Sequence, residues 1–385
     1  MNSITSRRSN ILPFLAIDML ARANSLKSKG KDIIHMDVGE PGFKTPAHIL
    51  EYAKTIIENK KIGYTESIGM PELRSKISDH YKYWYDEEVD SENIAVTAGA
   101  SGAFLLTLLA IFDPGDTVAI MTPYYPAYVN ALKALNINII YLEGDIKTSY
   151  QPTVEKLESI KKNINGIIMA SPANPTGSSI NTEDLKKIAN WSKKNKVAII
   201  SDEIYHGVEY GKFSETILKY NQDAIVINSF SKYFSMTGWR LGWLVAPKKI
   251  INTIEKLSMS LFLCPPTFSQ LIAIKAFEDY DILNKNVLIY KKNRDILISS
   301  FEDIGFFKYA PPDGAFYLYI DVSNITDDST DLAIKLLKEA GVSSTPGKDF
   351  DYNLGNKFIR LSYAGDHKEI LEGAKRIISW IKTKN

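Results

Sequence analysis

Residues 224–240 read AIVINSFSKYFSMTGWR, an apolar run followed by hydroxyl, aromatic and basic side chains. The first part, 224–229, is rich in Ile and Val, which is typical of a strand buried on both faces of a mainly parallel sheet. Lys232 follows the end of this strand, and Arg240 comes soon after it. Ligands bind beyond the carboxyl ends of the strands in open α/β sheets. A lysine buried there has a lowered pKa and can act as a nucleophile, although a surface lysine after a strand would give the same pattern.

Similar apolar runs recur between residues 94 and 246 and alternate with helical patterns. The strand candidates are 94–97, 118–121, 137–142, 166–171, 197–202, 224–229 and 242–246. Helical patterns cover 101–112, 182–194 and 248–258, and Thr182 with two acidic residues after it is typical of a helix start. This alternation predicts an α/β fold, with a large domain whose mainly parallel sheet is covered by helices.

The pattern changes after residue 283. Helical stretches there surround strand candidates at 316–321, 342–345 and 358–363, which predicts a smaller α+β domain. An amphipathic helix that ends near Gly30 and a strand at 33–38 come first in the chain, and we expect both to join the smaller domain. We therefore predict a large domain of residues 46–283 and a small domain formed by residues 1–45 and 284–385.

Charge and composition exclude several classes of protein. The 46 Lys and Arg nearly balance the 45 Asp and Glu, so we expect no nucleic-acid partner. The single cysteine, Cys264, excludes an internal disulfide and favours a reducing compartment, which predicts a cytoplasmic protein. The histidines lack metal-ligand spacing, so we expect no metal. The longest apolar stretch, 104–112, is much shorter than the roughly 20 residues that span a bilayer, so we expect no membrane partner.

The N-terminus carries a possible export signal. Arg7 and Arg8 precede an apolar run, as in a twin-arginine signal peptide. Asp18 interrupts that run, and Arg22 stands where the cleavage site would be. We therefore favour an amphipathic helix over a signal peptide in this segment.

Polar residues at other strand ends point to the same site. Asp202 could hydrogen-bond a heterocyclic nitrogen and keep it protonated, or it could cap a helix. Two prolines and a glycine in the loop 172–177 could aim Asn174, or the loop could be an ordinary turn. Ser229, Ser231 and Arg240 could bind one phosphate. The small residues at 98–103 could expose helix N-terminal amides to an anion, but they match neither the Walker nor the GxGxxG pattern.

Together, and in this order, these segments resemble those of the class I and II aminotransferases, which are pyridoxal 5′-phosphate (PLP) enzymes of fold type I. The resemblance extends over nearly the whole chain. It is closest to the prokaryotic aspartate-aminotransferase-like branch, through VGEPGF at 38–43, GYT at 63–65, DPGD at 113–116 and MTGWR at 236–240. It implies a PLP-dependent enzyme that moves an amino group between an L-amino acid and a 2-oxo acid, with 2-oxoglutarate as the expected acceptor, in ping-pong order and as a homodimer.

The resemblance also implies a chemical role for five residues. Lys232 matches the lysine that binds PLP as a Schiff base and moves the substrate proton. Asp202 matches the partner of the pyridine nitrogen, and Tyr205 and Asn174 match the pair that bonds the 3′-oxygen. Tyr125 matches the aromatic residue that stacks on the cofactor ring. Tyr125 and Tyr205 could instead be plain core residues.

Further matches concern binding. The phosphate group would be held by Ala100, Ser101, Gly102, Ser229, Ser231 and Arg240. Tyr64 matches a residue that reaches the phosphate from the neighbouring subunit. Arg360 matches the arginine that binds the substrate α-carboxylate, assisted by Gly39 and Asn174. A structural ion pair is the alternative role for Arg360.

Two other functions are compatible with these residues. A carbon–sulfur β-lyase or an aminocyclopropane-carboxylate synthase-like lyase would share Lys232, Asp202 and Arg360, and only independence from a 2-oxo acid would distinguish it. The effector domain of a PLP-binding transcription regulator would need a DNA-binding module, and few residues precede Gly39 to form one.

One departure from the family pattern concerns specificity. Ser101 stands where the aspartate-specific relatives carry a lysine that pairs with the distal carboxylate of the substrate. A serine brings no charge, so we predict broader or more neutral donors. A replacement cation could come from Arg22 or Lys27. The alternative is an apolar lining contributed by Ile11, Phe14 and Leu15.

Overall fold

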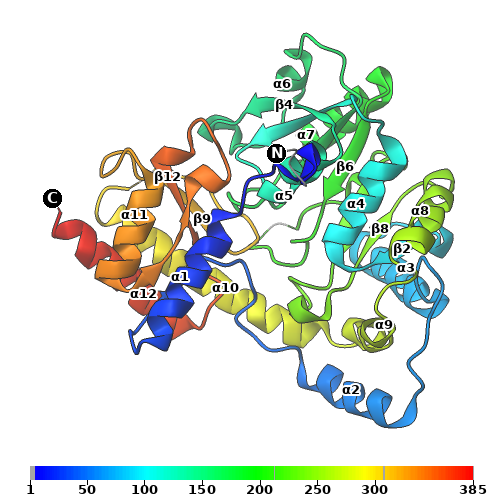
Figure 1. The fold of residues 1–385 in the computed structure, drawn as a ribbon, viewed down its shortest axis with the longest axis horizontal. Coiled ribbons are helices and arrows are strands. Elements are labelled where there is room, and N and C mark those ends of the chain that lie inside the picture. Colours follow the sequence, from blue (N-terminus) through cyan, green and yellow to red (C-terminus); the bar gives the residue numbers. More distant parts are fainter. Residues whose placement is uncertain (1–4, 212, 307, 385) are drawn as a thin grey trace.

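The computed structural model describes residues 5–211, 213–306 and 308–384. A seven-stranded sheet forms the centre of the larger part of the molecule, in the order β2-β8-β7-β6-β5-β3-β4 (Figure 1). Only β8 runs antiparallel to its neighbours in this sheet, which confirms the mainly parallel sheet. The strands are β2 (Ile94–Thr97), β3 (Thr117–Thr122), β4 (Asn138–Glu143), β5 (Gly166–Ala170), β6 (Ala198–Asp202), β7 (Ile225–Ser229) and β8 (Gly242–Val245).

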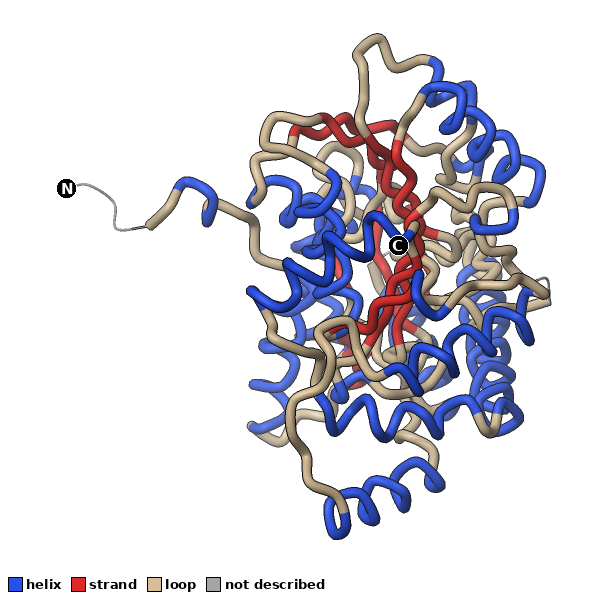
Figure 2. The backbone as a smooth tube through the Cα atoms, turned by 90° about the vertical axis from the view of Figure 1, so that its right-hand side faces the viewer, coloured by secondary structure: helices blue, strands red, loops and turns tan. Residues whose placement is uncertain are grey.

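Each central strand is apolar on both faces because both faces are covered by helices. Along β5, Ile167 and Met169 belong to one hydrophobic cluster and Ile168 to another. Figure 2 shows the strands as a central layer with helices on both sides. The helices of this part are α2 (Ala47–Asn59), α3 (Pro71–Tyr85), α4 (Gly99–Ile111), α5 (Pro126–Ala134), α6 (Val154–Glu158), α7 (Thr182–Asn195), α8 (Lys248–Leu261) and α9 (Thr267–Ala273).

A smaller part is built around a three-stranded antiparallel sheet in the order β11-β12-β9. The strands are β9 (Tyr317–Asp321), β11 (Thr345–Pro346) and β12 (Phe358–Ser362), with helices α10 (Tyr280–Glu302), α11 (Ser329–Lys335) and α12 (His367–Lys382). The N-terminal helix α1 (Leu15–Ser28) packs here through Met19 and Ala23. Strand β1 (Ile34–His35) pairs in parallel with β10 (Val342–Ser343). Both chain ends thus contribute to this part, and we propose 46–283 against 1–45 with 284–385 as the domain limits.

Three details differ from the sequence predictions. The strand expected at 342–345 divides at Ser344, because β10 pairs with β1 and β11 pairs with β12. The strand expected at 33–38 is only two residues long, because the backbone groups that follow it bond side chains: the Val38 amide donates to the Asp37 carboxylate at 3.0 Å, and the Asp37 carbonyl accepts from the Thr345 hydroxyl at 2.7 Å. The N-cap of α7 is Asn181, not Thr182.

Among the described residues, no helix is long and apolar enough to cross a membrane. The same residues contain no group of three or more His, Cys, Asp or Glu side chains that could hold a metal ion.

Candidate active site

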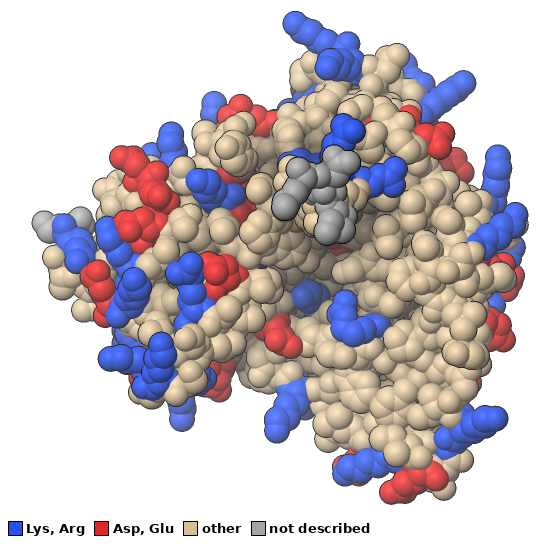
Figure 3. Space-filling model, viewed as in Figure 1, with Lys and Arg blue, Asp and Glu red and all other residues tan. Residues whose placement is uncertain are grey.

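A cavity of about 340 Å³ lies at the carboxyl ends of β5, β6 and β7, where Ala170, Asp202 and Ser229 contribute to its lining. Figure 3 shows the molecule hollowed between its two parts, with basic side chains at the hollow. All of the predicted site residues except Gly102 and Tyr64 line this cavity. The structure therefore brings together residues that are spread from Gly39 to Arg360 along the chain.

Lys232 reaches into the cavity from the turn after β7. Its Nζ donates to the Gly39 carbonyl at 2.7 Å and lies 5.9 Å from the centre of the Tyr205 ring. Burial lowers the pKa of Lys232 to about 8, and the nearby positive charges of Arg360 and Arg240 act in the same direction. A substantial fraction of the amine is therefore neutral near pH 8, as a nucleophile or a base requires.

Asp202 ends β6 as a buried carboxylate. It accepts hydrogen bonds from the Tyr128 hydroxyl and from the Ile204 amide at 3.2 Å, so it caps a turn and not a helix. Burial raises the pKa of Asp202 to about 6, while these hydrogen bonds oppose the rise. The sequence prediction missed Tyr128, although it follows Tyr125 at the i, i+3 spacing that places two residues on one helix face. The rings of these two tyrosines are 5.5 Å apart.

Tyr205 faces the cavity from the same turn as Asp202. Its hydroxyl lies 2.6 Å from that of Tyr317, another residue that the sequence prediction missed. Burial and Tyr317 raise the pKa of Tyr205 well above its ordinary value. A Cβ atom at Gly39 would lie 1.6 Å from the Tyr317 hydroxyl, so only glycine fits beside this pair.

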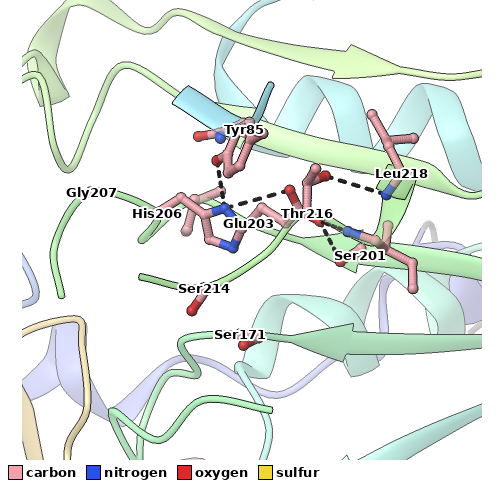
Figure 4. A network of polar contacts seen from close by, with 12 residues as sticks. Tyr85, Ser171, Ser201, Glu203, His206, Gly207, Ser214, Thr216 and Leu218 are labelled. Atoms are coloured by element: carbon pink, nitrogen blue, oxygen red, sulfur yellow. Dashed lines mark hydrogen bonds and ion pairs between the residues drawn. The ribbon is translucent and has the colours of Figure 1, made fainter. Parts of the chain in front are cut away.

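The side chains that alternate with Asp202 and Tyr205 form a buried network behind the cavity (Figure 4). Glu203 accepts from the Ser201 hydroxyl and from the Ile217 amide, both at 3.0 Å. His206 Nδ1 lies 2.6 Å from the Tyr85 hydroxyl. Burial raises the pKa of Glu203 to about 7 and lowers that of His206 to about 3. The turn that carries Asp202 and Tyr205 is thus anchored on its far side.

The other end of the cavity has the features of an anion site. Helix α4 begins at Gly99, so Ala100 and Ser101 lie in its first turn, where backbone amides lack helical acceptors. A Cβ atom at Gly99 would lie 2.6 Å from Arg240 Nη2, so this glycine lets the guanidinium approach the helix start. Gly102 belongs to the same turn but faces Thr97 and Ala98 instead of the cavity.

Arg360 enters the cavity from β12 in the smaller part. Its Nη1 donates to Asn174 Oδ1 at 2.8 Å, and its guanidinium carbon lies 4.4 Å from the centre of the Tyr317 ring and 4.7 Å from that of Phe350. Among the described residues, no carboxylate lies within ion-pair distance of Arg360. Among these residues, Arg360 therefore has no partner for the structural ion pair that was its alternative role.

The N-terminal segment supplies an apolar wall. Phe14, Ala16 and Ile17 line the cavity. Of the three apolar residues that we predicted there, Phe14 is placed correctly, whereas Ile11 and Leu15 do not line the cavity. The helix begins at Leu15, which turns that side chain away and brings the next two toward the cavity.

No additional cation replaces the missing lysine among the residues that line the cavity. Arg22, one of the two expected candidates, forms an exposed ion pair with Asp18 at 2.7 Å. Neither Arg22 nor Lys27 lines the cavity. The cations of the lining are Lys232, Arg240 and Arg360.

Comparison with known proteins identifies the family. Residues 31–377 match the family model described as "Aminotransferase class I and II". The chain belongs to the class I and II aminotransferases. A valine–pyruvate aminotransferase of Mycobacterium tuberculosis is 38% identical, with all of both chains covered. An aspartate aminotransferase of Sulfurisphaera tokodaii is 34% identical over 92% of this chain and 91% of its own. The crystal structure of an aminotransferase from M. tuberculosis superimposes with a TM-score of 0.97, at 37% identity, and covers 99% of this chain and 100% of its own.

The protein is therefore an aminotransferase of PLP fold type I, and PLP is its cofactor, as the sequence predicted. The cavity fits this cofactor. Gly99 keeps open a cradle for a phosphate between Arg240 and the start of α4. At the other end, the Asp202 carboxylate and the Lys232 amine are both within the lining.

Proposed function

We propose that this aminotransferase takes the amino group from a neutral, apolar L-amino acid and passes it to a 2-oxo acid in ping-pong order. The observation that carries this proposal is the apolar wall formed by Phe14, Ala16 and Ile17. The three cations of the lining all have other expected roles, so none of them is assigned to a charged group at the end of the donor side chain. The relatives reported above are named aminotransferases, which favours transfer over the lyase alternative.

The roles of the residues follow from their positions. Arg360, held by Asn174, binds the substrate α-carboxylate with its planar fork. Lys232 is the base that removes the α-proton, since its amine is partly neutral near pH 8. Asp202 would bond the pyridine nitrogen and keep it protonated, and Tyr128 fixes the orientation of the carboxylate.

PLP, when bound, supplies the electron sink for the pair of electrons left by the departing proton. Tyr125 would cover the ring, and Tyr205 with Asn174 would bond its 3′-oxygen. The phosphate group would be held by Ala100, Ser101, Ser229, Ser231 and Arg240, whereas Gly102, which we also expected there, would contribute only to the shape of the turn.

The acceptor uses the same cavity in the second half of a ping-pong reaction. From the sequence we expect 2-oxoglutarate, whose distal carboxylate Ser101 can bind only through a neutral hydrogen bond. The relative from M. tuberculosis is named for valine and pyruvate. Pyruvate has no distal charge and fits the apolar wall better, so we propose it as the second candidate.

We further propose that the enzyme is a cytoplasmic homodimer. Tyr64 is 85% exposed and lies outside the cavity, as a residue that serves a neighbouring subunit would. Large apolar side chains are also exposed along residues 57–64 and 259–263, and the Thr267 hydroxyl, which follows the second segment, bonds the Gly63 carbonyl of the first at 2.6 Å. These exposed residues are Ile57, Ile62, Tyr64, Met259, Leu261, Phe262 and Leu263.

The donor class is tested by kcat/KM for aspartate, alanine, valine, methionine and phenylalanine, each with pyruvate and with 2-oxoglutarate. We expect the neutral donors to match or exceed aspartate with at least one acceptor. A preference for aspartate above about a hundredfold, roughly 2.7 kcal/mol, would show that a charged distal contact exists and would contradict the proposal. Release of ammonia without any 2-oxo acid would instead support a lyase.

A further inference from the structure

The first turn of α1 has no capping side chain of its own. Phe14 occupies the N-cap position, and an apolar side chain cannot accept from the backbone amides that open a helix. Asp349 provides the acceptors, since Oδ1 accepts from the Leu15 amide at 2.9 Å and Oδ2 accepts from the Ala16 amide at 3.1 Å. Asp349 ends the short helix η8 (Gly347–Asp349), 334 positions after Leu15. A residue of the C-terminal part therefore fixes where the N-terminal helix begins.

The same N-terminal segment is also attached to the larger part of the molecule. Asn130, on α5, donates from Nδ2 to the Leu12 carbonyl at 2.9 Å. The Phe14 ring lies edge-on to the ring of Tyr125, with centroids 6.1 Å apart. Residues 12–16 thus bridge from α5 to η8 across the side of the cavity that Phe14, Ala16 and Ile17 line.

The first turn of α1 holds the side chains of this helix that line the cavity. Each residue turns an α-helix by about 100°, because a turn holds about 3.6 residues. Ile17, which lines the cavity, lies about 120° or more around α1 from Met19 and Ala23, which pack into the smaller part, whereas Ala16 lines the cavity from the first turn on the same side as Ala23. If the first turn of α1 loosens, Ala16 and Ile17 lose their fixed direction while Met19 and Ala23 still hold the helix in place.

Asp349 also lies close to the residues that bind the substrate carboxylate. Burial raises the pKa of its carboxyl group, and the two α1 amides and the Arg360 charge oppose that rise. The next residue, Phe350, contacts the Arg360 guanidinium at 4.7 Å and accepts from the Tyr124 amide at 3.0 Å. The apolar wall and the arginine that would bind the α-carboxylate are therefore held by adjacent residues.

We propose that Asp349 is a positioning residue for donor specificity, which caps α1 from the other end of the chain and so holds Phe14, Ala16 and Ile17 against the side chain of the amino donor. This inference rests on the proposed donor class. It assigns Asp349 no contact with the cofactor or with the reacting atoms.

The test is the Asp349→Ala variant, prepared as the PLP-bound full chain. We expect kcat/KM for leucine, divided by kcat/KM for alanine, to fall about fivefold to tenfold, because one methylene in an apolar pocket already changes kcat/KM by about tenfold or more. Alanine, which reaches the wall least, should lose much less. Hydrogen exchange of the amides in residues 11–22 should become faster, since the Leu15 and Ala16 amides lose their acceptors.

Asp366→Ala is the matched control. Asp366 caps α12 in the same part of the molecule, accepts from the Lys368 amide at 2.9 Å and does not line the cavity. This variant should leave both the leucine-to-alanine ratio and the exchange of residues 11–22 unchanged. Asp349→Asn, which keeps one carbonyl oxygen, should give an intermediate ratio.

If Asp349→Ala does not fold, Asn130→Ala tests the same wall from its other attachment and should lower the ratio in the same direction. An unchanged or increased ratio in the folded variant, or an equal loss for both donors, would overturn the inference. The wild-type donor panel tests the proposed function separately. If the wild type prefers aspartate, the donor class is wrong, and the leucine-to-alanine ratio still decides the role of Asp349.

Discussion

The Lys232 side chain is only partly exposed, and among the described residues no carboxylate lies within ion-pair distance of its amine. Its hydrogen bond goes to a neutral acceptor, the Gly39 carbonyl at 2.7 Å. Burial therefore acts against the charged amine, and the two arginines add to this effect. An amine in this state is suited to attack a carbonyl and then to take a proton.

Replacing Lys232 by alanine should abolish turnover without abolishing PLP binding. Nucleophile and base disappear together, so we expect kcat to fall by several orders of magnitude, while the phosphate contacts still retain the cofactor. Borohydride treatment of the wild type, followed by peptide mapping, should find the cofactor on Lys232. Lys375→Ala, at an exposed lysine of α12, is the control. Near-normal activity of Lys232→Ala would contradict the assignment.

Arg360 is fixed by more than its charge. The ring contacts with Tyr317 and Phe350 and the hydrogen bond to Asn174 all depend on a planar guanidinium. Arg360→Lys keeps the charge but loses the fork and the stacking. We expect a large fall in kcat/KM for every donor, with little change in PLP affinity measured by titration of the apo-protein. Loss of PLP affinity with normal donor kinetics would show that Arg360 is structural.

At the scale of elements, the turn after β6 is held from both sides. Asp202 and Tyr205 face the cavity, and Glu203 and His206 face the buried network of Figure 4. Burial raises the pKa of Glu203 from 4.5 to about 7. In the unfolded chain the pKa returns to its ordinary value. The stability that neutral Glu203 contributes is therefore complete at low pH and is lost as the pH rises through 7.

Glu203→Gln should remove this pH dependence, since glutamine stays neutral and its carbonyl oxygen can accept from the Ile217 amide. The free energy of unfolding of the variant, relative to that of the wild type, should increase from pH 5 to pH 8. One pKa unit corresponds to about 1.4 kcal/mol, so this increase should reach about 3 kcal/mol. Urea unfolding of both proteins at the two pH values measures this difference. Glu158→Gln, at an exposed glutamate, should show no such gain. Parallel pH profiles for wild type and Glu203→Gln would contradict the prediction.

The sequence predicted elements better than it predicted contacts between them. The inner strands of the large sheet are visible as apolar runs because burial on both faces determines their composition. The division at Ser344 is not visible, because it depends on partners far along the chain, β1 and β12.

The same reason explains the missed residues of the site. Tyr128 lies 74 positions from Asp202, and Tyr317 lies 112 positions from Tyr205. Neither contact produces a pattern in the sequence around either of its residues. Ile11 and Leu15 were misplaced because the start of α1 is capped by Asp349, at the other end of the sequence, and so has no local signal.

At the scale of the whole molecule, the cavity lies between two parts of the chain, with Lys232 on one side and Arg360 on the other. Two predicted site residues, Gly102 and Tyr64, do not line it, and of these Tyr64 is 85% exposed. In Figure 3, the surface over α4, α8 and α9 carries few charged side chains. A large apolar patch on a protein surface marks an interface, and a two-fold dimer would use the same patch on both subunits. We therefore expect sedimentation to find a dimer.

The Tyr64→Phe variant should weaken PLP binding, since one hydrogen bond to a charged group contributes about 1.5–3 kcal/mol, or about tenfold or more in the dissociation constant. Tyr352→Phe, at another exposed tyrosine, should leave PLP binding unchanged. Mixed dimers distinguish a contact across the interface from one within a subunit. A dimer of one Tyr64→Phe chain and one Lys232→Ala chain has, under our proposal, one site with both Lys232 and a partner's tyrosine. Half of the sites should then bind PLP with wild-type affinity and turn over. If Tyr64 acts within its own subunit, no site in the mixed dimer holds both groups, and weak binding at every lysine-containing site would overturn the prediction, as would an active, PLP-bound monomer.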